Sequence, residues 1–268
     1  MTAAEGRSIK TDGVFNLRDL GGLPTLDGRV VRAGQVLRAE ALAAPGTGEV
    51  YAVYADDLGE RMAHLGIRTV VDLRTDVECE NAPGLWALAL GAELVRVPIM
   101  EGAPGSDTDI FAMLLDGRLQ RLTPERLGQF YVESIARRPA DFGRAVSLIA
   151  ADERRPLLIH CTGGKDRTGI LAALLLSLLG VDEDLIVEDY AQTGINRPDR
   201  VSHYVDLLAN NGKSTDEARV LFETPPEAMR IMLDDLRRRY GTAREYLESA
   251  GAVPAATLDH LRDVLLTR

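Results

Sequence analysis

Residues 156–180 read PLLIHCTGGKDRTGILAALLLSLLG, and this stretch decides how the rest of the chain can fold. Its first part, residues 156–160, is a short apolar run that predicts a buried strand. Its last part, residues 167–179, is apolar on nearly every side, which predicts a buried helix ended by Gly180. A turn of small and polar residues lies between them. The sequence therefore predicts a strand, a tight turn and a helix at the heart of an α/β fold.

The same alternation extends outward from this stretch. Apolar runs at residues 67–73 and 92–99 predict two further strands, and a helix is expected over about residues 56–65. Beyond Gly180 the chain reads as wholly helical. Strands that alternate with helices are typical of an α/β sandwich with a largely parallel sheet. We expect residues 1–268 to form a single domain.

Two segments before the central stretch read as irregular. The first part of the chain is punctuated by glycine and proline and reads as turns and short strands. Within it, Asp27-Gly28 directly before Arg29-Val30-Val31 is a hairpin signal. Residues 101–109, EGAPGSDTD, are polar and rich in glycine and proline, which predicts a loop.

Composition and charge exclude several classes of protein. The 268 residues carry 31 basic and 41 acidic side chains, a net charge of −10 at pH 7. Nucleic-acid-binding proteins are usually basic, so this class is disfavoured, although one positive pocket can still bind an anion. The longest apolar run, Ile170 to Leu179, is too short to span a bilayer. Cys79 and Cys161 cannot build a disulfide framework, and the first residues hold no apolar signal core. We expect a cytoplasmic protein, with export lacking a signal peptide left open.

The residues that carry chemistry lie in the turn, residues 160–169, HCTGGKDRTG. Cys161 opens the turn and Arg167 closes it, with five residues between them. The backbone N–H groups of such a turn and of the following helix N-terminus can converge on one anion. The Arg167 fork can bind two oxygens of a phosphate, which lets the Cys161 sulfur attack phosphorus in line. The same positive environment is expected to favour the thiolate. His160 can orient the turn, and Thr168 can donate a hydrogen bond to the sulfur.

Other interpretations of the turn fit its residues less well. A core cysteine requires neither Arg167 nor the glycines and Lys165 before it. A Walker loop would have Ser or Thr where Asp166 stands, and its leading glycine is missing here. A rhodanese-type sulfurtransferase also places a cysteine between a strand and a helix, but the ending Lys-Asp-Arg-Thr-Gly argues against it. No His, Asp or Glu cluster has metal-ligand spacing, so we expect no metal and no other cofactor.

The turn matches Cys-x5-Arg-Thr/Ser and resembles the signature of the cysteine-dependent protein tyrosine phosphatase superfamily. More narrowly, it is similar to the Gly-Lys-Asp-Arg loop of bacterial atypical tyrosine and lipid phosphatases, including the mycobacterial PtpB type. Three further features resemble that family: residues 16–22 (NLRDLGG), residues 72–74 (DLR) and residues 246–266. The resemblance therefore covers nearly the whole chain.

This resemblance implies a tyrosine-phosphatase-like three-layer sandwich, with a central sheet between helices and a helical C-terminal part. It implies metal-independent hydrolysis of phosphotyrosine, with possible dual specificity, through a phosphocysteine on Cys161. The substrate would be a phosphorylated protein or a phosphoinositide, and inorganic phosphate would be a product. We call residues 161–167 the phosphate loop. Its expected phosphate-binding residues are Cys161, Thr162, Gly163, Gly164, Lys165, Asp166 and Arg167.

Two loops hold candidates for the general acid that protonates the leaving oxygen. The resemblance favours Asp166, which lies in the phosphate loop itself. Glu101 is the alternative, because dual-specificity phosphatases often place their acid on a loop at this point, and Asp107 and Asp109 are further candidates there. Any of these acids can instead be solvated loop residues. Lys165 either adds positive charge at the pocket rim, as in lipid phosphatases, or balances Asp166.

Five residues outside the phosphate loop are candidates for supporting roles. Asn16, Arg18 and Asp19 either brace the loop and line the pocket, or form a hydrogen-bonded turn. Asp72 and Arg74 follow a predicted strand, at the end where open α/β sheets bind ligands. Arg74 could bind substrate, anchor the loop or form an ordinary ion pair.

Three functional hypotheses remain. A tyrosine phosphatase is the main one. A phosphoinositide or inositol-phosphate phosphatase shares its chemistry, and Lys165 is compatible with it. A catalytically silent phosphate-binding module is the third, although Cys161 and Arg167 are both in place. By analogy with the family, about residues 195–225 could form a helical lid over the pocket, or simply pack on the fold.

Overall fold

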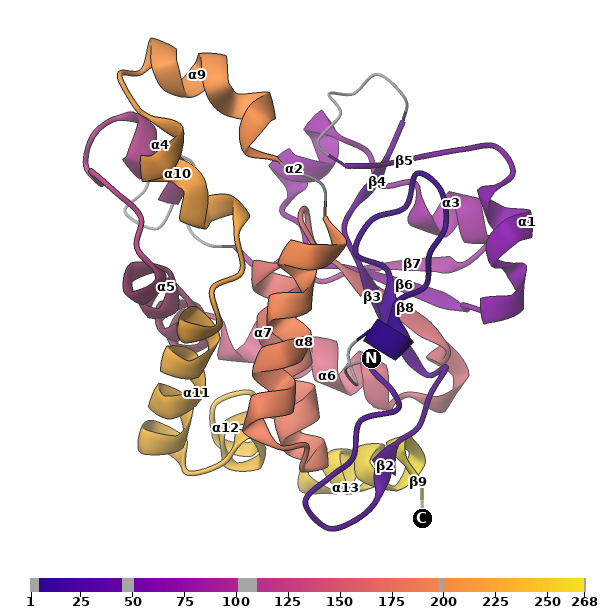
Figure 1. The fold of residues 1–268 in the computed structure, drawn as a ribbon. Helices are drawn as coiled ribbons and strands as arrows, with labels where there is room; N and C mark the ends of the chain where they lie inside the picture. The colour runs from indigo at the N-terminus through magenta and orange to yellow at the C-terminus, as the bar shows by residue number, and fades with distance from the viewer. Residues whose placement is uncertain (1–4, 45–50, 101–109, 198–199, 268) are drawn as a thin grey trace.

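A computed structural model describes residues 5–44, 51–100, 110–197 and 200–267. Its centre is a five-stranded sheet (Figure 1). The strands in spatial order are β1 (Arg18–Asp19), β3 (Val36–Ala39), β8 (Leu157–His160), β6 (Thr69–Asp72) and β7 (Glu93–Arg96). Strands β3, β8, β6 and β7 are parallel, and β1 pairs antiparallel with β3. The sheet is therefore mostly parallel, as the sequence predicts.

The register of the sheet brings the ends of three strands to one level. His160 of β8 is paired with Ala39 of β3 and with Asp72 of β6. The residues that follow these strands therefore meet at the carboxyl edge, next to the middle of the sheet. Open α/β sheets bind ligands at this edge.

Helices cover both faces of the sheet (Figure 1). Alternate residues of a strand point to opposite faces, so Leu158 and Val70 belong to one apolar cluster, and Ile159 and Val71 to another. The first cluster is completed by α1 (Leu58–Met62) and α3 (Trp86–Leu90). The second is completed by α5 (Pro124–Arg137), α6 (Pro139–Ala150), α7 (Asp166–Leu179), α8 (Glu183–Asn196), α11 (Pro226–Tyr240), α12 (Ala243–Ser249) and α13 (Ala255–Leu265).

The remaining elements are short. A third apolar cluster, of Leu114, Leu208 and Ala218, joins helices α4, α9 and α10. Their bounds are α4 (Ile110–Leu115), α9 (Val205–Asn210) and α10 (Thr215–Phe222), and α2 spans Asp76–Asn81. Two small sheets pair β2 (Val30–Val31) with β9 (Leu266–Thr267) and β4 (Leu42–Ala43) with β5 (Ala52–Val53). Single 3₁₀ turns are η1 (Glu5–Arg7), η2 (Ala63–Leu65), η3 (Asp152–Arg154) and η4 (Val201–Tyr204).

Local sequence signals explain where the central helices begin and end. Helix α7 ends at Gly180, whose φ of +85° favours glycine, and its residues are buried on nearly all sides because helices surround it. Helix α8 begins after Asp182, whose side chain accepts a hydrogen bond from the Asp184 N–H. Among the described residues, no helix is both long and apolar enough to cross a membrane.

Of two expectations about the ends of the chain, one is wrong and one is confirmed. The C-terminal part is not wholly helical, because Leu266 pairs with Val31 in the small β2–β9 sheet. The turn at Gly28 is present, with a φ of +83° and a hydrogen bond from Thr25 N–H to the Arg29 carbonyl. Strand β2, which follows that turn, therefore pairs both with the segment before the turn and with β9.

Candidate active site

The phosphate loop lies between the end of β8 and the start of α7. Cys161 follows the strand directly, is only 2% exposed and is a free thiol. The first turn of α7, from Asp166 onward, has backbone N–H groups without partners inside the helix. Gly164 has a φ of +59°, and a Cβ there would lie 2.2 Å from the Ala39 carbonyl oxygen. Only glycine fits at that point, and it allows the chain to turn tightly from β8 into α7.

The carbonyl groups of the loop are held from outside. The Ala41 N–H donates to the Thr162 carbonyl at 2.9 Å. The Gly164 carbonyl accepts from Arg38 Nη2 at 2.7 Å and from Asn16 Nδ2 at 3.1 Å. In a trans peptide the next N–H points opposite to the carbonyl. The N–H groups after these two carbonyls therefore point away from the outer contacts, toward the inside of the loop, as an anion site requires.

Arg167 is held in a fork by Glu78 of α2. Its Nη1 and Nη2 atoms each lie 2.6 Å from one Glu78 carboxylate oxygen. The Thr162 hydroxyl also donates to this carboxylate. Burial alone would raise the pKa of Glu78, but the hydrogen bonds and charge of Arg167 outweigh it and hold that pKa well below the usual range. Thr75 fixes the start of α2 through a capping box with Glu78.

Asp72, Arg74 and His160 form a buried group under the loop. Arg74 donates to Asp72 from Nε at 3.0 Å and from Nη2 at 2.7 Å, and Nη1 donates to the Ala82 carbonyl at 2.7 Å. His160 Nε2 lies 3.7 Å from Asp72, and its Nδ1 lies 3.0 Å from the Cys161 carbonyl. Burial lowers the pKa of His160, which favours the neutral ring. All three side chains are used in contacts within the protein.

Behind the loop, one buried carboxylate collects three guanidinium groups. Asp189 of α8 lies 3.0 Å from Arg7, 3.1 Å from Arg18 and 2.6 Å from Arg38. Burial raises the pKa of Asp189, but the three charges outweigh it and leave that pKa well below the usual range. Because Arg38 also binds the Gly164 carbonyl, this Asp189 cluster (Arg7, Arg18, Arg38 and Asp189) supports the loop from outside.

The predicted residues 16–19 divide between two places. Asn16 contacts the loop directly, and Arg18 reaches it through Asn16 and Asp189. The Asp19 carboxylate instead accepts hydrogen bonds from the N–H groups of Gly21 at 2.7 Å and Gly34 at 2.5 Å. Asp19 therefore closes a neighbouring turn.

Lys165 points toward the C-terminal helices. Its Nζ atom donates to the Leu221 carbonyl at 2.6 Å and to the Glu223 carbonyl at 3.1 Å, and lies 3.3 Å from Asp166. The side chain is only 2% exposed. In this conformation, the ammonium group ties the phosphate loop to the last turn of α10 and to the residue that follows it.

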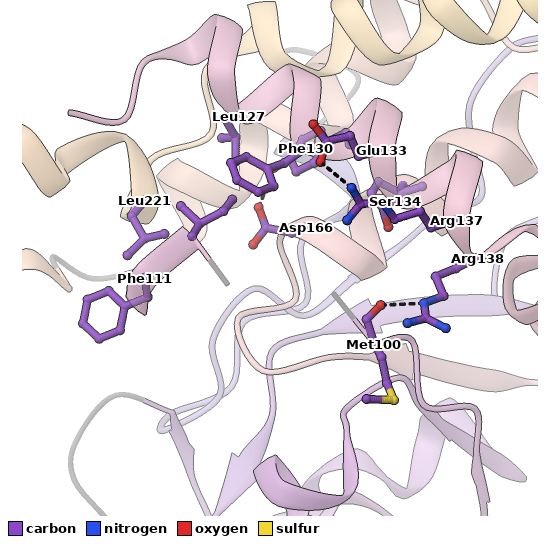
Figure 2. A pocket seen from close by; sticks show the side chains of 13 residues that line it. Met100, Phe111, Leu127, Phe130, Glu133, Ser134, Arg137, Arg138, Asp166 and Leu221 are labelled. Atoms are coloured by element: carbon purple, nitrogen blue, oxygen red, sulfur yellow. Dashed lines mark hydrogen bonds and ion pairs between the residues drawn. The ribbon is translucent and has the colours of Figure 1, made fainter. Parts of the chain in front are cut away.

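The Asp166 carboxylate faces a small cavity. It accepts a hydrogen bond of 2.5 Å from the Tyr131 hydroxyl, which lies 2.7 Å from the Tyr190 hydroxyl. Burial, followed by the charge of Asp166, raises the pKa of both tyrosines, so both remain protonated donors. Figure 2 shows Asp166 beside Phe130 and Leu221 at this cavity. The cavity has a volume of about 140 Å³. The cavity is lined by Met100, Ile110, Phe111, Leu127, Phe130, Tyr131, Glu133, Ser134, Arg137, Arg138, Asp166, Ile170 and Leu221.

The remaining predicted residues are Thr168 and three candidate general acids. The Thr168 hydroxyl is fully buried, and it has no hydrogen-bond partner among the residues that the structure describes. Glu101, the alternative general acid, lies outside the described residues, as do Asp107 and Asp109.

Comparison with known proteins now gives the family. A model of the tyrosine phosphatase family matches residues 9–267, so the chain belongs to this family and is a phosphatase. A protein of Cupriavidus necator, whose name assigns it provisionally to the tyrosine-protein phosphatases, is 30% identical over 96% of this chain and 89% of its own length. The triple specificity protein phosphatase PtpB of Mycobacterium tuberculosis is 27% identical over 95% of this chain and 97% of its own.

A solved structure gives a looser match. A Cys-to-Ser variant of P. aeruginosa TpbA, in complex with pTyr, is 17% identical over 82% of this chain and 98% of that chain, with a TM-score of 0.37. That superposition is too loose to transfer any detail of a site.

Sequence reasoning missed the partners that fix the loop. Glu78 carried a visible signal, because Thr75 and Glu78 have the spacing of a capping box, but that signal concerns the helix and says nothing of Arg167. Asp189 and Arg38 carried no signal at all. They come from a helix and a strand far from the loop in sequence.

Proposed function

We propose that this phosphatase hydrolyses phosphomonoesters, phosphotyrosine above all, with Cys161 as nucleophile and without a metal. The single observation that supports it best is the loop geometry. Carbonyls held from outside turn N–H groups inward over a buried free thiol, and Arg167 closes the loop. These donors can stabilise the equatorial oxygens of the transition state, which is the largest catalytic effect such a site can supply.

In the proposed first step, the Cys161 thiolate attacks phosphorus in line. The S–P bond forms as the bond between phosphorus and the ester oxygen breaks, and the electron pair of that bond stays on the leaving oxygen. Asp166 gives this oxygen a proton, so that an alcohol or phenol departs. The Arg167 guanidinium and the inward N–H groups hold the three remaining oxygens.

In the proposed second step, water hydrolyses the phosphocysteine. Asp166, now a carboxylate, takes a proton from water, whose oxygen attacks phosphorus. The S–P bond breaks and its electron pair returns to sulfur, which restores the thiolate and releases inorganic phosphate. The Thr168 hydroxyl, buried and without a partner among the described residues, is suited to donate a hydrogen bond to that sulfur.

The choice of Asp166 as general acid rests on its position. The carboxylate borders a cavity with mainly apolar walls, and Tyr131 and Lys165 fix its direction. A leaving group with an aromatic ring could enter such a cavity beside the acid. Glu101 is the alternative acid, and the pH dependence of its variant decides between them.

Substrate choice is the finer part of the proposal. The relative from M. tuberculosis is named a triple specificity phosphatase, which favours a site that accepts more than phosphotyrosine. Phosphoinositides, which the resemblance of the phosphate loop to lipid phosphatases implies, are the alternative substrate. We also propose that residues 1–268 act as one cytoplasmic catalytic unit, in which about residues 195–225 cover the loop. The hydrogen bonds from Lys165 to Leu221 and Glu223 support that cover.

A side-by-side rate comparison tests the function. A phosphotyrosine peptide, a phosphoserine/threonine peptide and a monophosphorylated phosphoinositide are assayed with EDTA present, each against the Cys161→Ser variant. We expect the highest kcat/KM for phosphotyrosine. A phosphoinositide preference would move the assignment to a lipid phosphatase. No turnover above the variant for any substrate would leave only a silent phosphate-binding module.

A further inference from the structure

A second charged group lies at the carboxyl edge of the sheet, beside the phosphate loop. Glu40 directly follows β3, and its side chain is completely buried. One carboxylate oxygen accepts from Arg197 Nε at 2.8 Å, and the other accepts from Arg200 Nη2. Arg200 also stacks on the Phe15 ring, with its guanidinium carbon 5.1 Å from the ring centre. Glu40 therefore holds two arginines that follow α8.

The outer end of Arg197 lies against the phosphate loop. A Cβ built on Gly163 would lie 3.3 Å from both Nη1 and Nη2 of Arg197. The Arg197 side chain is only 9% exposed, yet among the residues that the structure describes neither Nη atom has a hydrogen-bond partner. Neither Nη atom is among the buried polar atoms that lack a partner, so the fork is open to solvent beside the loop and can receive an anion there.

One edge of the Arg197 guanidinium is already occupied by Glu40. Glu40 occupies only the Nε edge of Arg197, so it positions this residue and leaves the two Nη atoms for an oxyanion. A guanidinium fork of this kind binds two oxygens of a phosphate at once.

We propose that Arg197 is a specificity-determining residue that binds a second phosphate on the substrate, on the carbon next to the one that carries the scissile phosphate. The inference rests on the proposed function, since it needs a phosphate in the loop. Gly163 is two positions from Cys161, so an anion on Arg197 must lie close to the scissile group. Two phosphates on neighbouring carbons of a polyol ring meet this requirement. A phosphotyrosine side chain carries a single phosphate and does not supply the second one.

The test compares kcat/KM for an inositol bisphosphate with neighbouring phosphates and for an inositol monophosphate. We expect Arg197→Gln to lower the ratio of the two values at least about tenfold, because the fork contacts only the second phosphate. Arg197→Lys keeps the charge and should recover part of the ratio. Arg219→Gln is the matched control, since Arg219 of α10 lines the same cavity as Arg197, but its side chain is 55% exposed and it pairs with Asp216. It should leave the ratio unchanged.

A purely structural role for Arg197 would lower both kcat/KM values together and leave their ratio unchanged, which would overturn the proposal. An equal fall of the ratio in Arg219→Gln would also overturn it. If Arg197→Gln does not fold, Arg197→Lys carries the test, with a smaller fall expected. Phosphatidylcholine vesicles that carry the corresponding phosphatidylinositol bisphosphate or monophosphate form a second arm. A fall of the ratio there alone assigns the phosphates to a lipid headgroup, and a fall in both arms assigns them to either source.

Failure of the proposed function would look different. In that case neither the inositol phosphates nor p-nitrophenyl phosphate would be hydrolysed faster by the wild-type protein than by Cys161→Ser. Turnover of p-nitrophenyl phosphate with an unchanged ratio would instead reject only the role of Arg197.

Discussion

The arginines behind the phosphate loop are bound differently from those at its mouth. In the Asp189 cluster three guanidinium groups share one carboxylate, and every side chain is at most 6% exposed. At the mouth, Arg167 is held by Glu78, whose side chain is 30% exposed. Ion pairs of the same kind thus have two different roles. Buried and shared charges fix the position of the loop, whereas charges near solvent can meet a substrate.

The largest expected effect is the loss of the nucleophile at the mouth. Cys161→Ser should lower kcat at least about a thousandfold, because serine lacks the reactive thiolate, while the unfolding midpoint stays close to that of the wild type. Steady-state turnover of a phosphotyrosine peptide and urea unfolding measure the two quantities. Turnover within tenfold of the wild type would reject Cys161 as nucleophile.

Behind the loop, the expected effect is on stability. Asp189→Asn leaves three buried guanidinium groups without a counter-charge, so the free energy of unfolding should fall by about 3–5 kcal/mol. Because the folded-state pKa of Asp189 is depressed, its contribution is present at neutral pH and is lost as the pH falls below about 4. Urea unfolding at pH 7 and at about pH 2.5 measures this, because the second pH lies well below the ordinary pKa of an aspartate. A loss below about 1 kcal/mol at pH 7 would mean that the cluster does not stabilise the fold.

Loss of the general acid should have the next largest effect, on the rate and its pH dependence. Asp166→Asn should lower kcat about a hundredfold and remove the decline of the rate at high pH, since the proton donor is lost. Glu101→Gln is the matched variant and should keep that decline. Rate profiles over pH for both variants decide the matter, and the reverse pattern would make Glu101 the acid.

The smallest expected effect separates the mouth from the back of the loop. Glu78→Gln replaces one charged oxygen of the fork, so Arg167 is held less firmly and kcat/KM should fall about tenfold. The free energy of unfolding should fall by less than in Asp189→Asn, because the Glu78 side chain is 30% exposed and solvent screens this pair more. Parallel kinetics and urea unfolding compare it with Asp189→Asn. Equal losses of stability in the two variants would remove the distinction between the two groups of arginines.

What the sequence could predict was local. The strand, turn and helix of the central stretch follow from neighbouring residues, as do Asp182 at the start of α8 and Gly180 at the end of α7. The parallel position of β3 did not follow, because only the register with β8 makes it a central strand. Partners such as Arg18 and Asp189 are 171 positions apart, and a charged residue carries no sign of its distant partner.

Glu101, the alternative general acid, lies outside the residues that the structure describes. Glu101 has to be judged from its variant alone. The sequence predicts Lys165 either at the pocket rim or beside Asp166, but its two carbonyl partners lie more than 50 positions away, and periodicity carries no sign of them.

The central claim is that phosphate passes through the sulfur of Cys161. Wild-type protein is mixed with a phosphotyrosine peptide, stopped with acid within the first turnover, digested and measured by mass spectrometry. The account predicts one added phosphoryl group on the peptide that contains Cys161, and none in Cys161→Ser. A phosphoryl group on any other residue, or rapid turnover by Cys161→Ser without an intermediate, would contradict it.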